Sequence, residues 1–198
     1  MSLKNLNPQF GVLLLFILAA GVIRVVLGAD ASMSPVAMFT PVGAMALFGG
    51  ATFQQKWKAY VFPLLALFLS DVVLMQFFQK EFAQGLLYSG WVWNYASFIL
   101  IVLAGQLMIK KAAVGNILLA SVAAAVIHWL VSDFGVWISG GWDMTTNKPY
   151  TKDAAGLISC YAQAIPYMRF FLAGTVIYAA IFFGGLVLVQ GKKLRAAH

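Results

Sequence analysis

Residues 114–142 read VGNILLASVAAAVIHWLVSDFGVWISGGW, and this stretch decides the fold. It contains one charged side chain, Asp133, among long runs of apolar residues. About 20 mainly apolar residues are enough for a helix to cross a bilayer. The stretch therefore predicts a transmembrane helix. An acid at membrane depth is costly, so Asp133 is a candidate for a functional site.

Two tryptophans lie on the same helical stripe as this acid. Trp129, Asp133 and Trp137 follow one another at intervals of four residues, which brings their side chains to one side of a helix. Gly140 and Gly141 then form a hinge into a polar loop. We expect the stripe to line an outward-facing binding site, with the loop as its lid.

The composition is that of an integral membrane protein. Of the 198 residues, 62% are hydrophobic and only 10% are charged. The net charge of +7 comes from short basic clusters between apolar runs, which argues against a nucleic-acid partner. The single cysteine, Cys160, cannot form an intrachain disulfide, and we treat it as a small apolar residue. No His/Cys cluster has zinc spacing, so we expect no metal and no cofactor.

We expect an all-α integral membrane protein that forms one domain over residues 1–198, with six transmembrane helices. The expected helices cover residues 10–29, 36–53, 57–77, 91–109, 114–139 and 167–189. Arg24 interrupts the first apolar run, so we interpret that run as a helix and not as a cleaved signal peptide. Pro41 predicts a kink or a re-entrant start in the second helix. The segment 154–165 ends at Pro166 and is either an interfacial helix or an extra turn of the last helix.

The charges of the loops predict how the chain is oriented in the membrane. One side of the six-helix arrangement carries basic residues alone: Lys4, Lys56, Lys58, Lys110, Lys111, Lys192, Lys193 and Arg195. The loops on the other side mix both signs: Lys80, Lys148, Lys152, Asp30, Glu81, Asp143 and Asp153. By the positive-inside rule, we expect both termini in the cytoplasm, and we expect a multi-pass protein of the inner (cytoplasmic) membrane. Loops 78–90 and 140–153 are then external.

Four charges lie in the outer half of the expected helices: Arg24, Asp71, Asp133 and Arg169. Two cations and two anions sum to zero, which suits either a paired network or a pocket for a zwitterionic or polar ligand. Alternatively, the arginines extend to the interface and the acids pair with their neighbours. Asp side chains are too short to reach the interface from membrane depth, which favours a binding or pairing role for both acids.

Aromatic residues gather on the external side. The helix over 91–109 opens with Trp91, Asn94, Tyr95 and Phe98 on one face. An aromatic belt at the membrane interface accounts for such rings without any ligand. The opposite interface has few rings, however, and this asymmetry favours an outward cavity lined by stacking surfaces.

The His128/Asp133 spacing is that of a class of glycerolipid acyltransferases. Five residues correspond to roughly 500° of helix rotation, so the two side chains point about 140° apart. We therefore expect a protein that is not an enzyme, with His128 packed as a neutral side chain in the bundle. No nucleotide-binding motif occurs either, so energy for any active transport must come from an ion gradient or another subunit.

Four stretches, taken together, carry a family resemblance: FTPVGAMALFGG (39–50), LSD (69–71), DFGVWISGG (133–141) and CYAQAIPYMR (160–169). Over residues 24–185, they resemble an uncharacterised family of small bacterial membrane proteins with a proposed transport role. In size and six-helix plan, that family is similar to the substrate-binding S components of energy-coupling-factor (ECF) transporters. S components bind vitamins, cofactor precursors or metal ions near their outer surface. They dock onto a coupling membrane protein with two ATPases.

The resemblance implies uptake of a small solute, of the vitamin or cofactor-precursor class, with such a coupling subunit as partner. S components often carry an Ala-x-x-x-Ala pair on the first helix for docking, whereas here Ala20 is followed by Arg24. We expect the substrate-binding residues to be Arg24, Thr40, Asp71, Trp91, Asn94, Trp129, Asp133, Trp137 and Arg169. Two alternatives stay open. One is a self-sufficient secondary or proton-coupled carrier that protonates Asp71 or Asp133, and the other is a structural membrane protein without a ligand.

Overall fold

The computed structural model describes residues 8–29, 35–53 and 55–196. Within these residues the chain forms six α-helices: α1 (Pro8–Gly28), α2 (Val42–Thr52), α3 (Lys56–Val73), α4 (Trp91–Met108), α5 (Val114–Ile138) and α6 (Ala154–Ala196). Three short helical segments accompany them: the 3-10 helices η2 (Pro35–Met38) and η4 (Lys80–Phe82), and the π-helix η3 (Leu74–Phe78). The expectation of an all-α protein is confirmed.

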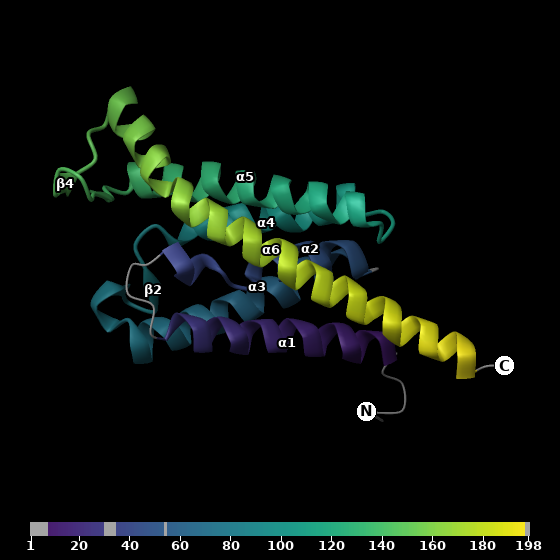
Figure 1. Ribbon diagram of the computed structural model, residues 1–198. Coiled ribbons are helices and arrows are strands. Elements are labelled where there is room, and N and C mark those ends of the chain that lie inside the picture. The colour runs from purple at the N-terminus through teal and green to yellow at the C-terminus, as the bar shows by residue number, and fades with distance from the viewer. Residues whose placement is uncertain (1–7, 30–34, 54, 197–198) are drawn as a thin grey trace.

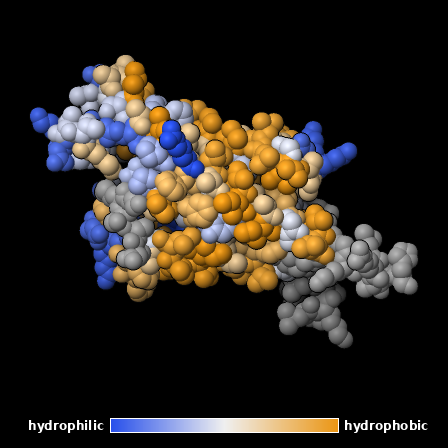
Figure 2. Space-filling view, viewed as in Figure 1, coloured by the Kyte–Doolittle hydropathy of each residue, from blue (hydrophilic) through white to orange (hydrophobic). Residues whose placement is uncertain are grey.

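Five helical segments are long and apolar enough to cross a membrane: Pro35–Thr52, Lys56–Phe78, Trp91–Met108, Val114–Ile138 and Ala154–Leu188. A shorter apolar stretch, Leu13–Gly28, belongs to α1. Hydrophobic residues cover the middle of the helices in Figure 2, and hydrophilic residues gather toward the ends. These features are those of a multi-pass membrane protein.

The helices run lengthwise through the molecule and alternate in direction. The start of α1 and the end of α6 lie at the same end of the bundle (Figure 1). The opposite end carries two small antiparallel hairpins, which the sequence did not predict. One pairs β1 (Ala83–Gln84) with β2 (Leu87–Tyr88), and the other pairs β3 (Trp142–Asp143) with β4 (Lys148–Pro149). We call this the hairpin end.

Helix α2 is the centre of the bundle. All residues from Val42 to Gly50 are buried, and α2 packs against α1, α3, α4, α5 and α6. Phe48 is fully buried, and its ring meets Phe16 edge-on at 5.7 Å and Phe183 at 5.2 Å between centroids. A helix that is apolar on every side is suited to such a central place.

Two glycines let α2 and α4 touch backbone to backbone. A Cβ at Gly105 would lie 2.5 Å from the carbonyl oxygen of Leu47, and a Cβ at Gly50 would overlap with the carbonyl oxygen of Val102. Small residues at a helix crossing permit this approach. The α2–α4 contact therefore depends on the absence of side chains at two positions.

The second predicted helix is interrupted, as Pro41 led us to expect. The predicted helix over 36–53 is divided into η2 and α2, and Pro41 occupies the N-cap of α2 without kinking it. Its carbonyl oxygen accepts a hydrogen bond from the Met45 amide at 2.8 Å. Proline cannot donate a backbone hydrogen bond, which costs least at the start of a helix.

The last helix begins earlier than the predicted start at residue 167. Residues 154–165 form the first turns of α6, and Pro166 lies inside it. The interfacial-helix alternative is thereby replaced by a continuous helix. Asp153 caps the start, because its Oδ1 accepts a hydrogen bond from the Gly156 amide at 2.8 Å. Helices in membrane proteins tolerate an internal proline when neighbouring groups satisfy the freed carbonyl.

We predict that Gly105→Ala destabilises the bundle by about 1–3 kcal/mol, because a methyl group there must push the α2 backbone away from α4. Thermal unfolding of the purified protein in detergent measures this effect. The matched control is Gly184→Ala on α6, where a Cβ would meet open space. Equal melting temperatures of the two variants would contradict the proposed backbone contact.

Candidate functional site

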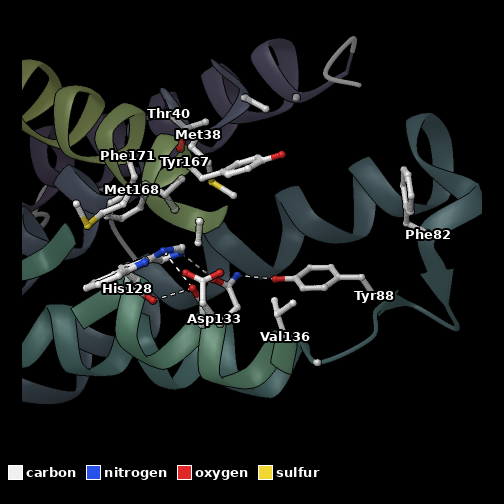
Figure 3. A pocket seen from close by; sticks show the side chains of 18 of the residues that line it. Met38, Thr40, Phe82, Tyr88, His128, Asp133, Val136, Tyr167, Met168 and Phe171 are labelled. Carbon is white, nitrogen blue, oxygen red and sulfur yellow. Dashed lines mark hydrogen bonds between the residues drawn. The ribbon is translucent and has the colours of Figure 1, made fainter. Parts of the chain in front are cut away.

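A cavity of about 520 Å³ opens inside the hairpin end of the bundle. All six helices contribute to its wall, together with η2 and the two loops over residues 78–90 and 140–153. Figure 3 shows Asp133 and Val136 on one wall, with Met38, Thr40 and Tyr167 facing them from the other. Small-molecule sites in proteins have this size and this mixture of apolar walls and a few polar groups.

An ion pair forms one side of the cavity. Arg24 on α1 approaches Asp71 on α3, with 2.5 Å between Nη2 and Oδ1. The hydroxyl of Tyr95 donates to the other carboxylate oxygen of Asp71 at 2.8 Å. Arg24 also donates from Nη1 to the Ser70 hydroxyl at 3.2 Å. Asp71 is completely buried, and both of its oxygens are engaged.

A second polar group joins α4 and α5. The His128 ring lies with Nε2 3.2 Å from Asn94 Oδ1, while the Asn94 amide nitrogen donates to the Tyr88 hydroxyl. Since Asn94 Oδ1 accepts, His128 carries its proton on Nε2 in this arrangement. Its ring also stacks on Phe171 at 4.3 Å. Burial raises the pKa of the Tyr88 phenol, which stays protonated at neutral pH.

Asp133 is the charged lining residue that lacks a side-chain partner. Its carboxylate makes no salt bridge or side-chain hydrogen bond to any residue that the structure describes; the thiol of Cys160 contacts only its backbone oxygen, at 3.4 Å. No hydrogen bond joins it to His128 in the described chain, in agreement with the predicted divergence of the two side chains. The Asp133 carboxylate is thus available to a molecule inside the cavity.

Loops 78–90 and 140–153 both contribute to the lining of the cavity. The first contributes Gln79, Phe82, Tyr88, Ser89 and Gly90 to the lining, and the second contributes Trp142, Met144 and Tyr150. Gln79 also donates to the carbonyl oxygen of Gly28 at 2.9 Å, which ties the first loop to α1.

Asp143 attaches the second hairpin to α6. Its Oδ1 accepts hydrogen bonds from the Thr145 hydroxyl at 2.6 Å, from the Thr145 amide at 2.8 Å and from Gln163 Nε2 at 3.0 Å. Gln163 Oε1 in turn accepts from the Tyr150 hydroxyl at 3.1 Å. The hydrogen bonds from Thr145 and Gln163 hold the pKa of Asp143 well below its usual range, so the carboxylate is ionised at neutral pH.

Six of the nine predicted site residues line the cavity: Arg24, Thr40, Asp71, Asn94, Trp129 and Asp133. The other three, Trp91, Trp137 and Arg169, lie outside its lining. Trp91 is 42% exposed at the start of α4. Trp137 is directed toward the second loop, where its Nε1 donates to the Thr151 carbonyl at 2.8 Å. Arg169 is exposed on α6, so the cavity does not collect four balanced charges.

Helix rotation explains why Trp137 and Arg169 lie outside the lining. Each residue advances the side chain by about 100°, so Trp137, eight residues after Trp129, lies about 80° around α5. Arg169 follows Met168 by one residue, and Met168 already faces the cavity. Residues spaced four apart drift around the helix, so the first and last of such a series do not both face the same cavity.

Several lining residues were not among the predicted site residues, and His128 and Gln163 are two polar examples. His128, which we set aside as a packed histidine, is packed as expected but also lines the cavity. Gln163 connects the hairpin to α6, and no sequence signal marked it, because residues 154–165 had no assigned partner. The polar character of Gln163 within a mostly apolar segment was the one feature that could have drawn attention to it.

Comparison with known proteins yields one match. The model of a family of unknown function, DUF6580, matches residues 4–197. No curated protein and no solved structure matches the chain.

We predict that Asp143→Asn loosens the second hairpin, because the uncharged amide replaces an acceptor of several hydrogen bonds. Hydrogen exchange at the Thr145 and Thr146 amides should become roughly tenfold faster. Glu81→Gln, an exposed acid on the first loop, is the matched control. Unchanged exchange in Asp143→Asn would show that the carboxylate does not hold the hairpin.

The same residue predicts the pH dependence of the hairpin. The pKa of Asp143 is lower in the folded protein than its ordinary value of 3.8, so its stabilising effect is complete above that value. The effect declines as the pH falls below 3.8 toward the folded pKa. Protection of the Thr145 amide, corrected for intrinsic exchange, should therefore be constant from pH 5 to pH 8 and fall below about pH 4. A loss of protection between pH 5 and pH 8 would contradict this assignment.

Proposed function

Since the chain belongs to DUF6580, a family of unknown function, we propose its function from the cavity: the protein binds a small solute there and serves its uptake across the membrane. The observation that carries the proposal is a cavity of about 520 Å³ under two external loops. Its walls are mainly apolar, with polar groups at a few points, as in sites for small organic molecules. An aromatic belt or a purely structural bundle has no need for such a space.

The proposal includes an orientation in the membrane. All six helices cross the bilayer, both termini are cytoplasmic, and the hairpin end faces outward. Loop charges support this: the basic pairs Lys56/Lys58 and Lys110/Lys111 flank the end opposite the hairpins, whereas the hairpin end mixes acids and bases. The corresponding location is the cytoplasmic membrane of a bacterium.

The proposed mechanism is like that of an S component of an ECF transporter. The solute enters from outside, the two loops cover it, and a coupling membrane subunit with ATPases supplies the energy for its release inward. The chain carries no nucleotide-binding motif of its own, which favours an external energy source. Ala20 is buried in the core, so a docking surface for that subunit would have to use other residues. The proposal assigns no catalytic step to the chain.

One observation favours the proton-coupled carrier as the second candidate. Asp133 is a carboxylate at membrane depth without a side-chain partner in the described residues, which is the arrangement of a proton-accepting group. Asp71 is a poorer candidate, because Arg24 and Tyr95 occupy both of its oxygens. Uptake by the chain alone in proteoliposomes, abolished when the proton gradient is collapsed, would favour this carrier over the S-component-like mechanism.

We predict that Ala164→Phe abolishes solute binding, because Ala164 lines the cavity and a phenyl ring there would occupy the space. The measurement is a thermal-shift screen of the purified protein against vitamins, nucleobases and metal ions, together with native mass spectrometry after gentle extraction. Compounds that stabilise the unaltered protein should bind Ala164→Phe at least about tenfold more weakly.

The matched control is Ala162→Phe, two residues earlier on α6, where the side chain is exposed and does not line the cavity. This variant should bind the same compounds normally. The proposal would be abandoned if native spectra show no bound molecule and no screened compound stabilises the unaltered protein. Equal loss of binding in both variants would place the site elsewhere.

A further inference from the structure

The charges of the described residues that line the cavity do not balance. They come from Arg24, Asp71 and Asp133, whereas Arg169 lies outside the lining. Arg24 and Asp71 neutralise each other at 2.5 Å. With His128 neutral, the Asp133 carboxyl group is the one acid of the described lining that has no opposite charge beside it. Lys152, from the second loop, is exposed over the Trp137 ring and likewise does not line the cavity.

From this imbalance we infer that the solute is an organic cation: a protonated amine joined to an aromatic or similarly flat apolar group. The inference rests on the proposed function and narrows its substrate class. An unpaired carboxylate inside a largely apolar cavity carries a desolvation cost, and a ligand with a positive charge offsets that cost by pairing with it. An anionic ligand would add to it.

The ammonium group of such a ligand would lie next to the Asp133 carboxylate. Asp133 is on α5, one turn after Trp129, and both side chains line the cavity. Tyr167 lies on the opposite wall (Figure 3). An ammonium group bound to the Asp133 carboxylate would thus have aromatic faces nearby, and such faces attract cations as well as apolar rings.

Arg24 does not offer a comparable site to an anion. Its guanidinium already donates to Ser70 and faces Asp71, and Asp71 is in turn held by Tyr95. Withdrawal of Arg24 toward a ligand would leave Asp71 buried without a counter-charge. The pair is therefore a fixed part of the wall, and recognition of charge falls to Asp133.

The test compares ligands that differ only in charge. Tryptamine, tryptophol and indole-3-acetate share an indole, as 2-phenylethylamine, 2-phenylethanol and phenylacetate share a phenyl ring. Binding of each to the full chain in lipid nanodiscs is measured by calorimetry at pH 7. We expect at least one amine to bind roughly tenfold or more tightly than its alcohol, with no binding of the carboxylates.

Variants assign that preference to one residue. Asp133→Asn should remove the tenfold preference for the amine while the alcohol binds as before. Asp133→Glu should retain a preference for the amine, which shows that the substituted protein folds and that charge matters. Glu81→Gln, outside the cavity, should behave like the unaltered protein.

Several outcomes would overturn the inference. They are equal binding of amine and alcohol, tighter binding of a carboxylate, a preference that survives in Asp133→Asn, or no binding of either amine. In each of these cases the proposed function survives if the broader solute screen yields a ligand that Ala164→Phe no longer binds. If that screen yields none, both proposals fail.

Discussion

A charge buried in an apolar bundle is costly unless an opposite charge lies beside it, and Asp71 meets this constraint through its ion pair with Arg24. Asp71 has no exposed surface, so it could not remain ionised there without Arg24 and the Tyr95 hydroxyl. The three side chains come from α1, α3 and α4, and their contacts tie these helices together at the hairpin end. Because the pair is complete, it leaves Asp133 as the charge directed to the cavity.

The cavity depends on where the helices begin as much as on their sequences. Helix α2 starts only after Pro41, and the segment before it lies against α6, where a Cβ at Gly174 would come 3.0 Å from the Thr40 backbone. Met38 and Thr40 therefore face the cavity from a short connecting segment. Farther from the hairpin end, the backbone contact between α2 and α4 fills the centre of the bundle. The cavity lies at the hairpin end, where the two hairpin loops join the helices in forming its wall.

The helices were predictable because a chain segment in lipid must satisfy its own backbone hydrogen bonds, and a helix does so. The predicted spans 91–109 and 114–139 differ from α4 and α5 by one residue at their ends. The start of α6 was not predictable in the same way, since residues 154–165 are less apolar and end at a proline. The hairpins were missed because each strand has only two residues, too few for an alternating pattern.

The amino-acid sequence by itself determined that the chain is helical and apolar, that its acids are rare, and that Asp71 and Asp133 lie within apolar helices, where an acid is costly. Only the tertiary structure decided that the surroundings of the two acids differ. Two side chains pair only if their helices bring them close together, and the sequence pattern does not contain that distance. The pattern grouped Arg169 with the other three charges, although Arg169 lies on a side of α6 that does not line the cavity. The packing of α1 against α3 matched Arg24 to Asp71, whereas Asp133 lines the cavity without a side-chain partner among the described residues.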